Sequence, residues 1–297
     1  KIDASETGGS LMLDTQQAGL SLPAVFPEPD IAFDRLQARV AWRNLAEEIA
    51  VDIEKLAFSG PDATGEAHGN YRYTGKGPGL IDLQATIDRA DGRAVWRYMP
   101  HVVNADARTW LKYGILAGTG YDAKLILRGD LYDFPFREPS TGKFLVTAKA
   151  RDVVVDYADD WPRIEGIAAD MAFDYGMRVN ASAGQILGAS LSGVSVVIPD
   201  FDASDELLLV KGRASGPTAE FLKFIDQSPV AGSIDHFTEG MKAMGSGRLD
   251  LELDIPLRRP LQTRMRGNYH FQDNQVHLVE GLPWITQVNG RLDLTEG

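Results

Sequence analysis

The stretch Leu249-Asp-Leu-Glu-Leu-Asp-Ile255 carries an apolar residue at every second position. Successive side chains of a β-strand point to opposite faces, so this alternation predicts a strand with one apolar and one solvated face. Residues 81–88 and 265–271 alternate in the same way. Such strands are typical of antiparallel sheets with one wet side. We therefore predict a mainly β fold with a few short helices.

Helical spacing is confined to a few segments. Residues 107–115 carry apolar side chains at helical spacing, with Asn104 or Asp106 as the N-cap, and residues 93–99 form a shorter amphipathic stretch before them. Pro217 is suited to start a second helix. A third helix is predicted after a Ser233 cap, with three apolar side chains on one face: Phe237, Met241 and Met244. We expect these helices to pack on the sheet.

An internal repeat organises the chain. Phe33–Trp42, Ile164–Phe173 and Ile285–Leu294 share one spacing of large and small apolar residues, at offsets of 131 and 121 residues. The first two copies are followed by further strand-like runs and then by a helical segment. This order predicts a repeated strands-then-helix unit of roughly 125 residues, in which stacked neighbours bury each other's faces. The expected repeats, within one elongated β-groove covering residues 1–297, are 20–117, 118–245 and a truncated 246–297.

Composition excludes several function classes. The 297 residues are 44 % hydrophobic and 24 % charged, which allows a large core. A net charge of −12 disfavours nucleic acid as a partner, because nucleic-acid binding needs clustered Lys and Arg. The absence of Cys rules out disulfides and thiolate metal sites. Because no signal peptide begins at Lys1 and no stretch approaches the roughly 20 apolar residues of a membrane span, we expect any anchor to lie outside this segment.

The segments that resemble catalytic or cofactor-binding motifs do not have the residue spacing that those motifs require. Residues 69–76 resemble a phosphate-binding loop but have five residues between the glycines where four are needed. Residues 75–79 do not open a helix, so they are no dinucleotide fingerprint. We interpret both as a Gly-rich hairpin loop. The chain is therefore predicted not to be an enzyme and to need no cofactor.

The metal-binding residue types also lack a ligating pattern. No histidine pair shows helical spacing with an intervening Glu, and His270 and His277 are expected to be solvated on a wet face. The acidic residues of 200–206 lack the turn glycine of a calcium loop and are interpreted as a solvated turn. No metal site is predicted.

A series of short segments, in this order from about residue 93 to the end, resembles the YhdP family of AsmA-like proteins. The segments are Trp110–Gly118, Ala123–Asp130, Asp133–Phe136, Gly142–Phe144, Val154–Tyr157, Trp161–Pro162, Ile186–Gly188, Ile198–Asp200, Gly212–Pro217, Leu282–Trp284 and Gly290–Leu292.

This resemblance implies a bridge-like lipid transfer protein of the Gram-negative envelope, anchored in the inner membrane and reaching across the periplasm. Its implied fold is a strongly twisted, open β-groove with an apolar floor. The implied partners are phospholipid acyl chains and components of the inner and outer membranes. The family offers no catalytic residues to carry over.

The apolar alternates of the clearest strands are the candidate groove-lining residues: Ile81, Leu83, Ile87, Leu125, Leu127, Leu249, Leu251, Leu253, Met265, Tyr269 and Phe271. Plain core packing is the alternative for each of them. Two other functions stay open at this point. An envelope scaffold or assembly factor would close its apolar faces into an ordinary core, and a carbohydrate-active β-solenoid enzyme would need paired carboxylates in a cleft.

Overall fold

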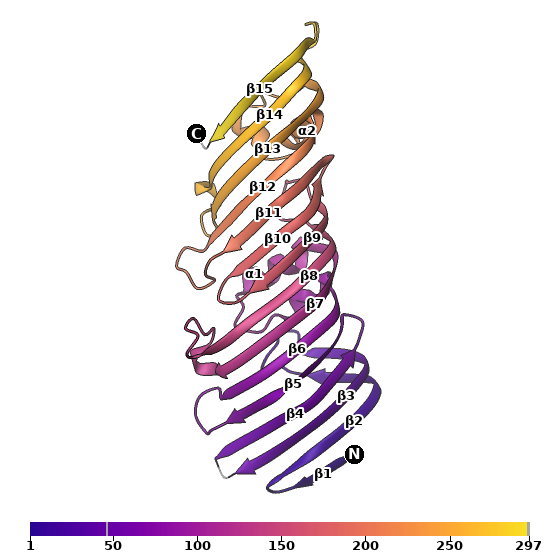
Figure 1. Ribbon diagram of the computed structural model, residues 1–297, viewed down its shortest axis with the longest axis vertical. Coiled ribbons are helices and arrows are strands. Elements are labelled where there is room, and N and C mark those ends of the chain that lie inside the picture. The colour runs from indigo at the N-terminus through magenta and orange to yellow at the C-terminus, as the bar shows by residue number, and fades with distance from the viewer. Residues whose placement is uncertain (46, 296–297) are drawn as a thin grey trace. The chain divides into compact units, whose positions relative to one another are not determined.

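The computed structural model describes residues 1–45 and 47–295. Over these ranges, 15 strands form one sheet in which each strand is hydrogen-bonded to its neighbours in the sequence (Figure 1). The pairs are antiparallel, and the first and last strands of the order do not pair with each other, so the sheet is not closed into a barrel. The predicted mainly β fold, with an open antiparallel sheet and few short helices, is confirmed.

The chain divides into two compact units. Unit 1 comprises residues 1–112, 118–150 and 171–175, and unit 2 comprises residues 113–117, 151–170 and 176–297. Strands β7, β8 and β9 contribute residues to both units. The strands that begin in unit 1 or are shared are β1 (Ile2–Ser5), β2 (Gly8–Ser21), β3 (Asp30–Leu45), β4 (Glu48–Ser59), β5 (Ala63–Tyr73), β6 (Leu80–Asp91), β7 (Ile115–Asp130), β8 (Gly142–Val155) and β9 (Ile164–Phe173).

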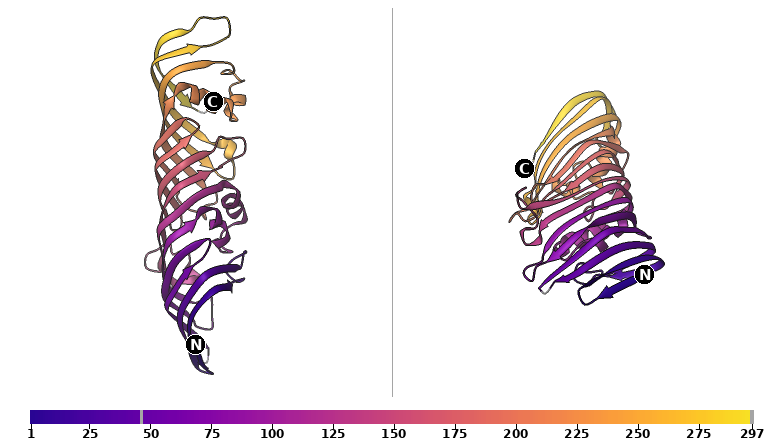
Figure 2. Two further views of the ribbon diagram at one scale, coloured as in Figure 1. Left: turned by 90° about the vertical axis from the view of Figure 1, so that its right-hand side faces the viewer. Right: turned by 60° about the horizontal axis from the view of Figure 1, so that its bottom comes forward.

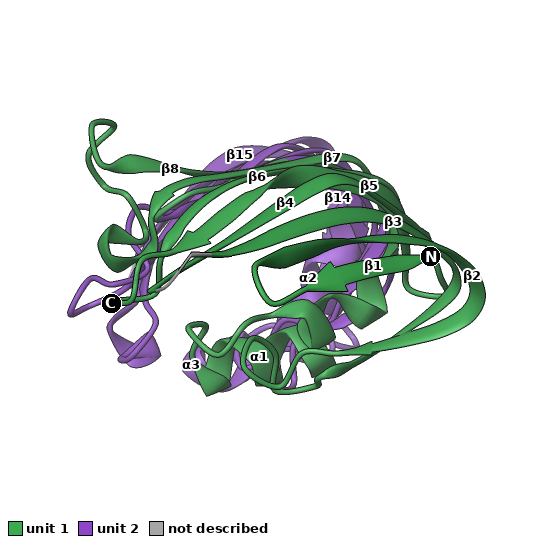
Figure 3. Cartoon of the chain, turned by 90° about the horizontal axis from the view of Figure 1, so that it is seen from below, with its two compact units in different colours: residues 1–112, 118–150, 171–175 green, residues 113–117, 151–170, 176–297 purple. Residues whose placement is uncertain are grey.

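The remaining strands belong to unit 2, and the helices are short. These strands are β10 (Met177–Ile186), β11 (Ala189–Ile198), β12 (Leu207–Pro217), β13 (Lys242–Pro256), β14 (Arg264–His277) and β15 (Ile285–Thr295). The helical segments are η1 (Gly92–Tyr98), α1 (Ala105–Gly114), η2 (Leu131–Asp133), α2 (Thr218–Asp226), α3 (Val230–Ser233) and η3 (Pro260–Gln262). In each unit the α-helices lie on one side of the strands (Figures 2 and 3). No helix of the described residues is long and apolar enough to span a bilayer.

Local chemistry explains where the predicted helices start. The Asn104 side chain accepts a hydrogen bond from the Ala107 backbone at 2.7 Å, which satisfies a free donor in the first turn of α1. Asp91 caps η1 in the same way through the Arg93 backbone at 2.9 Å. Pro217 ends β12, and α2 begins at the next residue. These helix starts follow the sequence prediction.

Two sequence predictions were wrong. The helix expected after Ser233 does not form, since α3 ends at that residue and Met244 lies in β13. Asp235 and His236 adopt φ of 50° and 57°, which are incompatible with a right-handed helix. Gly69 lies inside β5 and not in the hairpin loop, which is confined to residues between β5 and β6.

Few large apolar side chains are buried. Of the described residues, the large apolar ones in the core are Leu36, Phe136 and Tyr269, at 5–9 % exposure, and the others are alanines. The protein exposes 18257 Å². A compact monomer of 32.5 kDa would expose about 12,000 Å², and two separate compact bodies of half that mass about 15,000 Å². The protein therefore exposes more surface than one or two compact bodies of the same mass would.

Candidate functional site

One face of unit 1 gathers the candidate residues of β6 and β7. Directly opposite residues of an antiparallel pair share a face of the sheet. Leu83 lies opposite Leu127, and Leu125 lies opposite Ala85. Ile81 and Ile87 occupy the same phase of β6 as Leu83. The five candidates predicted in this unit therefore lie together on one face.

The apolar face continues across the neighbouring strands of unit 1. One row of successive cross-strand partners is apolar from β2 to β7: Leu11, Val40, Ile53, Gly69, Leu83 and Leu127. A second row is apolar as well: Leu13, Ala38, Leu56, Ala67, Ala85 and Leu125. Strand β5 contributes only small side chains to these rows. A Cβ added at Gly69 would come within 2.1 Å of the Asp82 carbonyl oxygen, so this position has no room for a side chain.

Unit 2 repeats the arrangement with β13 and β14. Leu249 lies opposite Tyr269 and Leu253 opposite Met265, while Leu251 and Phe271 each lie opposite a glycine. The six candidates predicted in this unit therefore share one face. Leu251 lies between Gly212 of β12 and Gly267 of β14, and Gly267 in turn lies opposite Leu294 of β15. Large side chains thus alternate with glycines across the sheet.

These apolar faces remain accessible to solvent. Of the eleven candidates only Tyr269 is buried, and the other ten are partly exposed. Closed β-sandwiches instead bury their inward residues against a second sheet. The sheet of this protein has no such second layer within the described residues, where all strands belong to the one sheet.

The opposite face of each unit is polar and carries cross-strand ion pairs. In unit 1, Arg128 contacts Asp82 at 2.9 Å. In unit 2, Lys211 contacts Glu252 at 3.1 Å, and Arg213 donates to Asp250 at 2.8 Å. The hydrogen bond from Arg213 lowers the pKa of the Asp250 carboxyl. These exposed pairs add little stability but keep this face charged and wetted.

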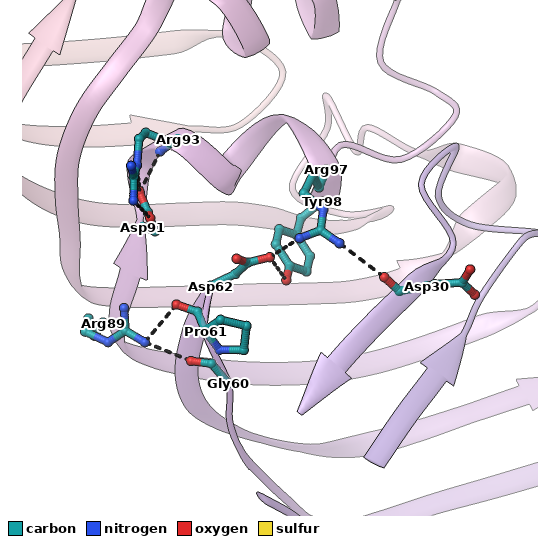
Figure 4. Close-up of polar contacts among 9 residues, drawn as sticks. All are labelled: Asp30, Gly60, Pro61, Asp62, Arg89, Asp91, Arg93, Arg97 and Tyr98. Carbon is teal, nitrogen blue, oxygen red and sulfur yellow. Dashed lines mark hydrogen bonds and ion pairs between the residues drawn. The ribbon is translucent and has the colours of Figure 1, made fainter. Parts of the chain in front are cut away.

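The helical insertion between β6 and β7 begins with η1, and polar contacts hold η1 to the ends of neighbouring strands (Figure 4). The Asp62 carboxylate accepts hydrogen bonds from Arg97 at 2.5 Å and from the Tyr98 hydroxyl at 2.9 Å. Arg97 also donates to the Asp30 carbonyl. Burial, followed by the Asp62 hydrogen bond and charge, raises the pKa of Tyr98 to about 12. This cluster ties η1 to the ends of the strands.

The helical insertion of unit 2, residues 218–241 between β12 and β13, packs directly on the apolar face. The Phe221 ring of α2 lies 4.9 Å from the Tyr269 ring. The Thr218 hydroxyl oxygen accepts hydrogen bonds from the Tyr269 hydroxyl at 2.8 Å and from the Asn274 amide at 2.6 Å. Asn274 is completely buried. Burial raises the pKa of Tyr269.

Asn274 and Thr218 were not predicted as part of this site. The sheet register shifts between Phe271 and Asn274, which changes the face to which the following residues point. Alternation counted from Met265 therefore assigns Asn274 to the wrong face. In that alternation Asn274 falls among polar residues such as Asn268 and His270, so no signal in the sequence marks it, and only the register shift places it on the apolar face.

Outside the apolar face, the predicted solvated position of His277 was wrong. Its ring lies 5.3 Å from the Trp284 ring, and its Nδ1 is buried without a hydrogen-bond partner. The acidic turn at residues 200–206 lies between β11 and β12 as predicted. Among the described residues no group of His, Asp and Glu is arranged to hold a metal ion.

Comparison with known proteins agrees with this geometry. The YhdP protein family matches residues 1–297. A relative, the intermembrane phospholipid transporter YhdP of Escherichia coli (strain K12), is 25 % identical over 281 residues, or 93 % of this chain. The matched chain spans only 22 % of that relative's length. No solved structure matches the chain. Because the family match covers the whole sequence, the chain belongs to the YhdP family.

Proposed function

We propose that this chain is a segment of a lipid conduit, whose apolar face binds phospholipid acyl chains and lets them move between the inner and outer membranes. The observation that supports this most is the row of accessible apolar side chains that continues from strand to strand in each unit. Acyl chains would lie on this face, while headgroups would stay in water at the strand ends. The eleven candidate residues would form part of the lining.

The energetics of an open apolar face suit a conduit. Burial is worth about 0.8 kcal/mol per methylene, so a 16-carbon chain could gain on the order of 10 kcal/mol before ordering costs. Rows of similar residues offer similar sites at successive strands, so a step from one site to the next need change the free energy little.

The relative's function and the polar outer face support the setting of this proposal. The Escherichia coli relative is an intermembrane phospholipid transporter. By analogy, the chain would be the periplasmic part of a longer inner-membrane-anchored protein of a Gram-negative bacterium, with partners in both membranes. A scaffold with a closed core is less favoured, because it would bury large apolar side chains that remain accessible here.

Native mass spectrometry with lipid extraction tests the proposal. The purified chain is expected to carry phospholipid, and Leu83→Asp is expected to remove most of it, because a carboxylate on the apolar face must be desolvated by an acyl chain. Thr86→Asp is the matched control, since Thr86 lies on the polar face of the same strand opposite Lys124. A lipid-free protein that takes up no labelled phospholipid from vesicles would refute the function.

A further inference from the structure

A shallow, open cleft in unit 2 lies beside α2 and is unlike the apolar face. It has a volume of about 660 Å³ and is lined by two loops: Asp160, Trp161 and Pro162 from the β8–β9 loop, and Asp226, Gln227, Ser228 and Pro229 from the end of α2. Its lining combines one large aromatic ring with two carboxylates. The cleft contains no Lys or Arg.

The position of Asp226 in the cleft has a structural cause. Thr238, which is buried, donates a hydrogen bond to Asp226 Oδ1 at 3.1 Å and fixes that side chain. Asp226 is also the last residue of α2, so the negative end of the helix dipole lies beside it. The neighbouring cations are engaged elsewhere: Arg163 pairs with Asp156 at 2.9 Å, and Lys223 lies 3.9 Å from Glu220. The cleft therefore has an uncompensated negative potential.

Aromatic rings connect the cleft to the apolar face of the same unit. Trp161 lies 5.7 Å from the Phe224 ring of α2 and 6.1 Å from the Tyr157 ring. One turn before Phe224 on the same helix, Phe221 contacts Tyr269 on the apolar face. A ligand whose tail lies on that face would thus have its polar end near the cleft.

We infer that this cleft binds the ammonium group of a zwitterionic phospholipid headgroup, with Trp161 supplying a π face and Asp160 and Asp226 supplying the charge. An indole face and carboxylates are what an ammonium ion prefers when it leaves bulk water. An anionic headgroup would be repelled by the same two carboxylates. The inference rests on the proposed lipid-binding function and adds a headgroup preference to it.

The test is lipid uptake from mixed vesicles. Vesicles with equal amounts of phosphatidylethanolamine and phosphatidylglycerol, matched in acyl chains, are incubated with the protein, and the bound lipids are extracted and quantified. The wild type should enrich the ethanolamine lipid about two- to fivefold, the ratio expected from exposed ion pairs with the two carboxylates. The double variant Asp160→Asn/Asp226→Asn should lose the enrichment and keep its total lipid. Asp159→Asn, in the same loop but outside the cleft lining, should behave as the wild type.

Two results would overturn the inference while leaving the proposed function intact: a wild-type ratio equal to that of the vesicles, or an enrichment that persists in the double variant. If neither lipid binds, the proposed function fails. A titration with soluble headgroup compounds then tests whether the cleft binds an ammonium group. Phosphoethanolamine should shift the indole N–H resonance of Trp161, assigned by its loss in Trp161→Phe, whereas glycerol phosphate should not. Equal or absent shifts would refute an ammonium site.

Discussion

The two helical insertions are fixed to the sheet by different forces. In unit 1, Arg97 and Tyr98 of η1 donate hydrogen bonds to Asp62, which lies just before β5. In unit 2, α2 is fastened by Phe221 and Thr218, which contact residues of β14 on the apolar face itself. A helical insertion that follows a β-strand can therefore be held at the strand ends, as after β6, or on the apolar face itself, as after β12.

This difference has consequences for stability and for lipid binding. A charge-fastened segment depends on protonation and salt, whereas a segment fastened by ring packing depends on buried area. In unit 2, a lipid lying on the apolar face would have to share it with α2. In unit 1, the hydrogen bonds of η1 go to Asp30 and Asp62, which lie at the strand ends.

The largest expected effect concerns the packing of α2. Phe221→Ala should weaken the attachment of α2 to β14 by about 2–4 kcal/mol, because it removes a ring packed on Tyr269. Hydrogen exchange measured in α2 and β14 reports this change. Phe237→Ala is the matched control, since Phe237 is 73 % exposed in the same insertion. Unchanged protection of α2 in the first variant would show that its attachment does not depend on this contact.

The next effect concerns the polar attachment of η1. Asp62→Asn removes the negative charge of the carboxylate that accepts hydrogen bonds from Arg97 and Tyr98. It should lower the free energy of local opening of η1 by about 1–2 kcal/mol. The exchange rates of the η1 amides measure the effect, with Asp88→Asn on an exposed position of β6 as control. If the η1 amides keep their protection, polar contacts are not what hold the insertion.

Titration of Tyr98 sharpens the same comparison. Its pKa is raised from the ordinary 10.0 to about 12, so the neutral form is favoured in the folded protein. The stability from this shift is fully present below pH 10 and is lost as the pH rises from about 10 to 12. The difference in tyrosinate absorbance between the wild type and Tyr98→Phe should show a midpoint near 12, and Asp62→Asn should lower it. A midpoint near 10 in the wild type would contradict the contacts assigned to Tyr98.

The smallest effect is expected on the polar outer face. Lys211→Gln removes an exposed ion pair with Glu252 and should cost less than about 1 kcal/mol, with a smaller effect in high salt. Urea unfolding at low and high ionic strength measures this cost. Lipid occupancy should not change. A loss of bound lipid in this variant would show that lipid binds on the polar face and contradict binding on the apolar face.

The fold was largely predictable from the sequence because alternation is a local property. The Leu249–Ile255 pattern predicts the strand and its apolar face, and Asn104 predicts the start of α1. The face of Asn274 was not predictable, because it depends on a register shift against β15. The positive φ angles of Asp235 and His236 exclude the predicted third helix, although the spacing of Phe237, Met241 and Met244 suits one.

The candidate residues were predictable as a set but not as a site. Period-2 spacing places Leu251 and Leu253 on one side of a strand, yet it does not show whether a second layer covers them. The hydrogen-bond order of the strands supplies that information. The cleft at Trp161 could not be found from the sequence, because it joins two loops that are more than 60 residues apart.

Photo-crosslinking along one strand tests the central claim most directly. A benzophenone amino acid is placed in turn at each position from 249 to 253 in β13, and the protein is loaded with phospholipid and irradiated. The account predicts lipid adducts at 249, 251 and 253 and few at 250 and 252, because the side-chain period of a strand is two. Equal labelling at all five positions, or labelling of the charged positions alone, would contradict binding of acyl chains on the apolar face.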